Sequence, residues 1–225
     1  MSLPLSPAPA ASGRRLLLAV GMVGAPVCLA LGNLILPPAH GTAAQQLQAV
    51  HASTAAYLGG SVIDAAGFAL LGAVGVGIAT LLPRRGALLA TIAALLTLAG
   101  GTVMGGAVLT TSIVEAALPL SHGAEVLAAL QGSAAVGLLF QFSLLAAVGG
   151  LLGVVALLVG RPVSWWVPVL FLVGLLLTMA GGGVIGAVLT IPLLIATALL
   201  ARALVRRSPV VTAAVEAPSE RIAAA

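Results

Sequence analysis

Long stretches of the chain are apolar and nearly free of charge, and arginine, proline or a run of polar residues bounds each of them. A helix needs about 20 predominantly apolar residues to cross the ~30 Å hydrocarbon core of a bilayer. The pattern predicts six spans, at residues 16–36, 60–82, 88–115, 134–159, 164–183 and 186–206. The expected fold class is therefore an all-α membrane protein, a polytopic helical bundle formed by residues 16–207.

The last apolar stretch, residues 164–205, can be divided in two ways. As a single helix it would extend about 63 Å, which is about twice the hydrocarbon thickness. Two short spans with a turn near residues 183–186 avoid that excess length. Six spans are therefore the prediction, and five are the alternative.

The composition supports a membrane protein and excludes a soluble one. Hydrophobic residues make up 61% of the chain and charged residues 6%, whereas a surface in contact with water needs far more charge. The formal net charge of +4 does not indicate a nucleic-acid partner, because the cations lie at the ends of apolar stretches rather than on one polar face. A single cysteine, Cys28, leaves no intramolecular disulfide.

The cations predict which way the protein faces. All nine are arginines, at positions 14, 15, 84, 85, 161, 202, 206, 207 and 221. Arg and Lys accumulate in cytoplasmic loops, and the connections 37–59 and 118–133 contain neither. We therefore expect these two connections outside and both termini in the cytoplasm, with residues 1–15 as an amino-terminal segment and 208–225 as a disordered tail.

Small residues at four-residue spacing predict how the helices pack. Lipid tails are as apolar as leucine, so helices in a bilayer associate mainly through close contact between small residues. A spacing of three or four residues places such residues on one face of a helix. Gly101 and Gly105 in the third span, and Gly182 and Gly186 near the last turn, are the positions expected to make these contacts.

Asp64 is the only aspartate, and it falls about one turn inside the second predicted span. Burying a carboxylate at that depth is unfavourable, so an ionisable residue there is a functional hypothesis by default. Its candidate partners are Gln141, at a comparable depth in the fourth span, and Asn33, near the outer end of the first; the alternative is a neutral, protonated carboxyl group without a partner. Asp64 either forms an ion, proton or ligand site near the outer leaflet or reaches water at the interface.

The outer connections contain the remaining titratable groups. His40, His122 and Glu115 are the candidate binding residues there, with His51 and Glu125 nearby. Imidazole and carboxylate groups can bind a divalent metal, but no pair has a recognised ligand spacing. We therefore predict no metal site, no cofactor and no catalytic residue.

A short amphipathic helix is predicted on the outer surface. Within residues 45–58, the apolar side chains Leu47, Val50, Tyr57 and Leu58 follow a helical spacing, although Thr54 interrupts the stripe. Helices of this kind lie in the plane of the membrane interface. The segment would cover the ends of the spanning helices or cap a cavity between them.

Four local features follow one another along the chain: Leu36-Pro37-Pro38, Tyr57-Leu58-Gly59-Gly60, Pro83-Arg84-Arg85 and Arg161-Pro162. Their order, over about residues 14–207, resembles a group of actinobacterial six-helix integral membrane proteins of uncharacterised activity. The resemblance implies six spans and no particular activity. A chain without lysine and rich in Ala, Gly, Leu and Val is also typical of a GC-rich genome, so we expect the bacterial inner membrane as its location.

Three functions are compatible with these features. The first is a non-enzymatic accessory or scaffold protein, whose partners are the lipid bilayer and either another membrane protein or a second copy of the chain. The alternative is a small transporter or channel that uses Asp64 as the coupling or selectivity group. The third is a membrane enzyme that acts on a lipid.

Overall fold

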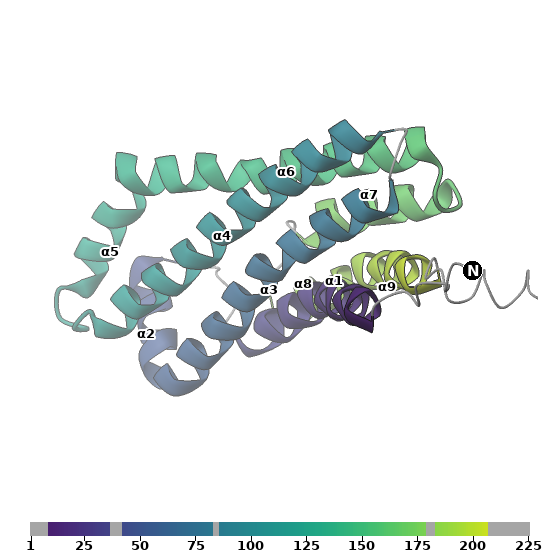
Figure 1. The fold of residues 1–225 in the computed structure, drawn as a ribbon. Helices are drawn as coiled ribbons and strands as arrows, with labels where there is room; N and C mark the ends of the chain where they lie inside the picture. Colours follow the sequence, from purple (N-terminus) through teal and green to yellow (C-terminus); the bar gives the residue numbers. More distant parts are fainter. Residues whose placement is uncertain (1–8, 37–41, 83–85, 179–182, 207–225) are drawn as a thin grey trace, which may run out of the picture.

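The computed structural model describes residues 9–36, 42–82, 86–178 and 183–206, and all regular secondary structure within these ranges is helical. Four long helices form the body of the protein: α1 (Pro9–Ile35), α3 (Thr54–Leu81), α4 (Ala87–Ala117) and α6 (Ala134–Gly160). Three more follow along the chain: α7 (Trp166–Thr178), α8 (Gly183–Leu189) and α9 (Ile191–Arg206). Two short helices, α2 (Ala43–Ala52) and α5 (Gly123–Gln131), lie together at one end of the bundle (Figure 1).

Five apolar segments are long enough to cross a membrane, judged by length and composition: Gly13–Ile35, Thr54–Leu81, Ala87–Ala117, Ala134–Gly160 and Gly183–Arg206. The last of them comprises α8 and α9, which meet at a turn at Thr190. The chain is thus a polytopic, all-helical membrane protein with five long candidate spans in the part that the structure describes.

The region predicted to hold the last two spans is arranged differently from the expectation. α7 has 13 residues, so at 1.5 Å per residue it extends only about 20 Å. Residues 183–186, near which a turn was expected, form the start of α8 and include a buried Gly186, and the four residues between α7 and α8 lie outside the described ranges. Gly183 has a φ of 62°, a left-handed conformation that glycine adopts without strain. The predicted Gly182 lies outside the described residues.

The helix that contains the second predicted span begins before that span does. α2 starts with a capping box, in which Thr42 Oγ1 accepts from the backbone of Gln45 and the Gln45 side chain accepts from the backbone of Thr42. The chain bends at Ser53, whose φ and ψ are −152° and 54°, and α3 starts at Thr54 rather than Gly60. The amphipathic segment 45–58 is therefore divided between two helices.

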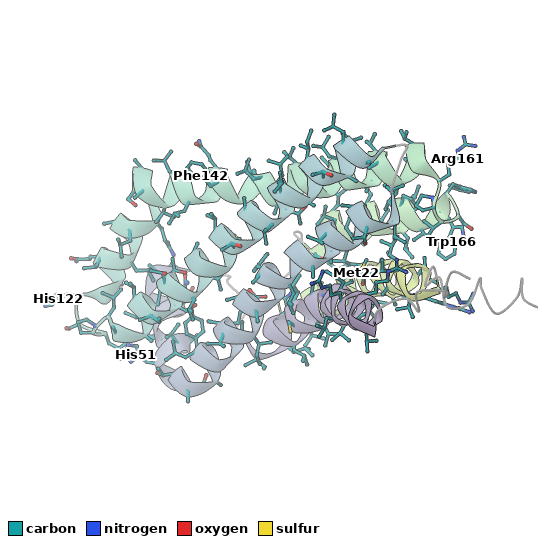
Figure 2. The ribbon with its side chains drawn as sticks, in the orientation of Figure 1. Met22, His51, His122, Phe142, Arg161 and Trp166 are labelled. Atoms are coloured by element: carbon teal, nitrogen blue, oxygen red, sulfur yellow. The ribbon has the colours of Figure 1, made fainter. Side chains whose placement is uncertain are left out.

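The two ends of the bundle differ in charge. We call one the arginine end. α1 begins there and carries Arg14 and Arg15 near its start, and Arg161 lies there directly after α6 (Figures 1 and 2). α9 ends there and carries Arg202 and Arg206 near its end. His51 and His122 lie at the opposite end, which we call the capped end, together with α2 and α5 (Figure 2). The main cluster of buried apolar side chains lies toward the arginine end and includes Met22, Leu81, Leu157, Leu193 and Leu200.

Glycines allow the long helices to approach closely. A Cβ atom at Gly105 of α4 would lie 2.7 Å from Ala65 O of α3, and one at Gly101 would collide with Phe68 O of the same helix. On the other side of α4, a Cβ at Gly100 would collide with the backbone of Ala146 in α6. α4 is therefore held between α3 and α6 at distances that only glycine permits at these positions.

Candidate functional site

A cluster of polar side chains lies at the capped end, where α2, α3, α4 and α5 meet. Its centre is Glu115 of α4, whose side chain is only 6% exposed. Gln46 Nε2 of α2 donates to Glu115 Oε1 at 2.9 Å, and the Tyr57 hydroxyl of α3 donates to Glu115 Oε2. One carboxyl group thus joins three helices.

The cluster extends in two directions from Glu115. One turn deeper, Ser61 Oγ of α3 lies 2.7 Å from Ser112 Oγ of α4 and 2.9 Å from Tyr57 O. Toward the surface, Gln131 Nε2 of α5 donates to Gln46 Oε1 at 3.2 Å. The Gln46 amide therefore connects the buried carboxyl group to the helix that covers it.

The apolar face of α2 explains why Gln46 points inward. Leu47 and Val50 are both buried, and they lie next to Gln46 along the same short helix. His51 adds a polar contact, because its Nε2 lies 2.8 Å from Leu118 O at the end of α4. A Cβ at Gly123 of α5 would lie 2.7 Å from Leu47, so α5 packs directly onto α2.

Every buried side-chain nitrogen or oxygen in the described part of the chain has a hydrogen-bond partner. This matters for Glu115, because a buried carboxyl group without partners would be strongly unfavourable. Removing one hydrogen-bond partner from such a group lowers the stability of the folded protein by about 1–3 kcal/mol. The hydrogen bonds of this cluster therefore attach α2 to α3 and α4 in one specific arrangement.

Asp64 lies on a different side of α3 and is partly buried against α1. A Cβ atom at Gly32 of α1 would lie 2.7 Å from Asp64 Cβ and 2.9 Å from Asp64 Oδ1. Asn33 follows Gly32 and is also partly buried, whereas Gln141 is exposed on α6. The structure thus places Asp64 at the α1–α3 contact and its other candidate partner on the outside of the bundle.

The other predicted binding residues are scattered. His122 is exposed at the start of α5, and its side chain makes no capping bond there. His40 lies outside the described residues. Within the described ranges, no group of three or more His, Cys, Asp or Glu residues could hold a metal ion.

Sequence reasoning found Glu115 but missed the residues that surround it: Gln46, Tyr57, Ser61, Ser112 and Gln131. A signal was present, because Tyr57 and Ser61 are four residues apart and Ser112 and Glu115 three apart, which puts each pair on one helical face. What the spacing could not show is that the two faces meet.

The surface near the start of α6 is the second feature of interest. No residue of α6 before Ala146 is buried among those whose side chains the structure describes. A small groove of about 140 Å³ separates this part of α6 from α4, and Met104, Val108, Val136 and Leu139 are among its lining residues. Gln141 lies in the same exposed stretch.

No family model, curated protein or solved structure matches the chain.

Proposed function

We propose that the chain is a non-enzymatic accessory or scaffold protein of the bacterial inner membrane, which crosses the membrane six times and has both termini in the cytoplasm. The first support is the separation of charge between the two ends. Every described arginine is at the arginine end, and the connection that contains α5 has none. Cytoplasmic loops are the ones that hold Arg and Lys.

The sixth crossing is assigned to α7, paired with α8 and α9. α7 leaves the arginine end at Trp166, and α9 returns to it at Arg206 (Figure 1). A Cβ atom at Gly174 would collide with the backbone of Leu193, so the two helices are in close contact. A bilayer can thin locally around a short span, which accommodates the limited length of α7.

The observation that carries the scaffold role is the exposure of Gln141. This residue lies seven positions into α6, about 10 Å along its axis, and the side chain faces outward from the bundle. A glutamine amide that faces lipid leaves its hydrogen bonds unmade, whereas one that faces another helix can form them across the contact. The exposed first half of α6 is therefore the proposed contact surface for a partner helix.

Photo-crosslinking from within the membrane tests this role. A photoreactive residue at Leu138, one turn before Gln141, is expected to form a discrete protein adduct, either with a partner or with a second copy. The same residue at Leu151, which is also exposed on α6 but away from Gln141, is the control and should give no adduct. Gln141→Leu should abolish the Leu138 adduct. Equal adducts from both positions, or none from Leu138, would refute the scaffold assignment.

A second candidate function, transport, is favoured by Asp64 alone. Its carboxyl group is partly buried within a span, and no side-chain hydrogen bond to it is present in the described ranges. A group of this kind can couple to an ion or proton. Purified protein in vesicles with a pH-sensitive dye inside would then show a proton flux that Asp64→Asn removes. Equal flux in the variant, or flux no greater than in empty vesicles, would eliminate this candidate.

A further inference from the structure

We propose that a groove between α1 and α9 binds one anionic phospholipid from the leaflet at the arginine end. The groove has a volume of about 730 Å³, which is within the ~300–1,000 Å³ typical of ligand sites. Its walls are Val20, Val23 and Val27 on α1, and Arg202, Val205 and Arg206 on α9. The site is independent of the proposed partner contact, which lies on α6.

The apolar wall matches an acyl chain. On α1 the groove extends from Ala19 to Val27, about 12 Å along the helix axis, and its lining there consists of alanine, valine and glycine. The groove is open to the outside rather than enclosed, and α1 and α9 are both candidate membrane spans. The surroundings of such an opening in a bilayer are lipid tails.

The two arginines match the headgroup. Arg202 and Arg206 are four residues apart, so they lie on the same face of α9, and both are exposed. Arg206 is in the last turn of α9, and Arg202 lies one turn deeper. A guanidinium group can bind a phosphate through two parallel hydrogen bonds, and basic sites between membrane helices on the cytoplasmic side bind anionic headgroups.

The protein itself supplies no described anion for these two cations. The acidic residues in the described ranges are Asp64, Glu115 and Glu125, and all three lie in the half of the bundle toward the capped end. A guanidinium group without a counter-ion is unfavourable next to hydrocarbon. A lipid phosphate at the mouth of the groove would neutralise Arg206 and Arg202 together.

The experiment measures lipid binding to the purified full-length chain in detergent. A short-chain phosphatidylglycerol is titrated while thermal unfolding is followed, and short-chain phosphatidylcholine is the zwitterionic comparison. We expect phosphatidylglycerol to raise the midpoint of unfolding in a saturable way and phosphatidylcholine to raise it much less. The double variant Arg202→Gln/Arg206→Gln should bind phosphatidylglycerol about 30-fold more weakly, since each arginine near an anionic surface contributes about fivefold.

Two further variants separate the groove from a general effect of charge. Arg14→Gln removes an exposed cation from the same end that does not line the groove, and it should leave the affinity unchanged. Val20→Trp keeps both arginines but fills the apolar wall at an exposed position, and it should weaken binding as strongly as the double variant. Equal responses to the two lipids, an unaltered affinity in the double variant, or an equal loss in Arg14→Gln would overturn the proposal.

Inorganic phosphate at the same concentration is the last arm. Because the site is proposed to hold the acyl chain as well as the headgroup, phosphate alone should neither stabilise the protein nor displace the lipid. Full protection by phosphate would show a simple anion site and would contradict a lipid site.

Discussion

At the arginine end, the buried side chains are almost all apolar, and the few buried hydroxyl groups bond within their own helix. Thr197 Oγ1, for example, donates to Leu193 O in the preceding turn of α9 at 2.9 Å. At the capped end, Glu115, Gln46 and Tyr57 instead bond from one helix to another. Close packing of apolar side chains therefore stabilises the half toward the arginine end, whereas hydrogen bonds between helices add to the packing in the half toward the capped end.

The difference follows from what surrounds each half. Within the hydrocarbon, apolar burial gives little preference for protein over lipid, so helices are held by close packing. At the capped end, α2 and α5 cover the ends of α3 and α4, and polar groups can be buried there only if they bond to one another. The two halves should consequently respond to different substitutions.

The largest expected effect is a cavity in the apolar half. Leu200 is fully buried in α9, and Leu200→Ala should lower the free energy of unfolding by about 2–5 kcal/mol because its neighbours cannot close the space completely. Leu176→Ala on α7, where the side chain is 60% exposed, is the matched control and should change little. Denaturant titration in detergent measures both, and similar losses would mean that the apolar core is not closely packed.

The next effect concerns the backbone contact between α3 and α4. Gly101→Ala places a methyl group against Phe68 O and should destabilise the protein by about 1–3 kcal/mol. Gly106→Ala, five residues further along α4, has no atom within 4 Å of its new methyl group and should be neutral or stabilising by up to about 1 kcal/mol. If the two variants unfold at the same temperature, α3 and α4 are further apart than the structure shows.

A smaller and more local effect is expected in the polar cluster. Tyr57→Phe removes the hydroxyl that donates to Glu115 and should destabilise the attachment of α2 by about 1–3 kcal/mol. Protease cleavage near α2 should become faster, whereas the unfolding temperature of the whole protein should change only slightly. Glu115→Leu should have a similar effect, and the double variant should be less damaging than the sum, because the two residues share one interaction. Strict additivity would argue against their hydrogen bond.

The smallest effect is expected at the edge of the cluster. The bond between Gln131 and Gln46 is exposed and 3.2 Å long, so Gln131→Ala should cost no more than about 0.5 kcal/mol. Cleavage near α2 should remain close to that of the unmodified protein. A loss as large as that of Tyr57→Phe would move the main attachment of α2 from α3 and α4 to α5.

The membrane class and the positions of most long helices could be predicted from the sequence, because charge-free stretches of about 20 residues have few other structures available. The stripe of Leu47 and Val50 likewise indicated a short surface helix, and both side chains are buried. These features depend on spacing along a single helix, which a sequence displays directly.

Features that depend on the angle between helices could not be predicted. Gln141 was one candidate partner of Asp64, yet its side chain is exposed on α6, because an almost wholly apolar helix does not reveal which of its sides faces the rest of the bundle. The contact of Tyr57 with Glu115 joins residues 58 positions apart and requires α3 and α4 to meet at one register. The helical connection α5 was missed for a related reason, since its nine residues are fixed by packing of Leu127 and Gly123 onto their neighbours.

Thiol labelling in intact cells tests the central claim, that the capped end faces outward and the arginine end faces the cytoplasm. With Cys28 replaced by alanine, a single cysteine is placed at Ser121 or at Ser164, which are exposed serines at the capped end and the arginine end respectively. A membrane-impermeant maleimide in the medium should label Ser121→Cys at once and Ser164→Cys only after the cells are opened. Labelling of Ser164→Cys from the medium, with Ser121→Cys protected, would contradict the account.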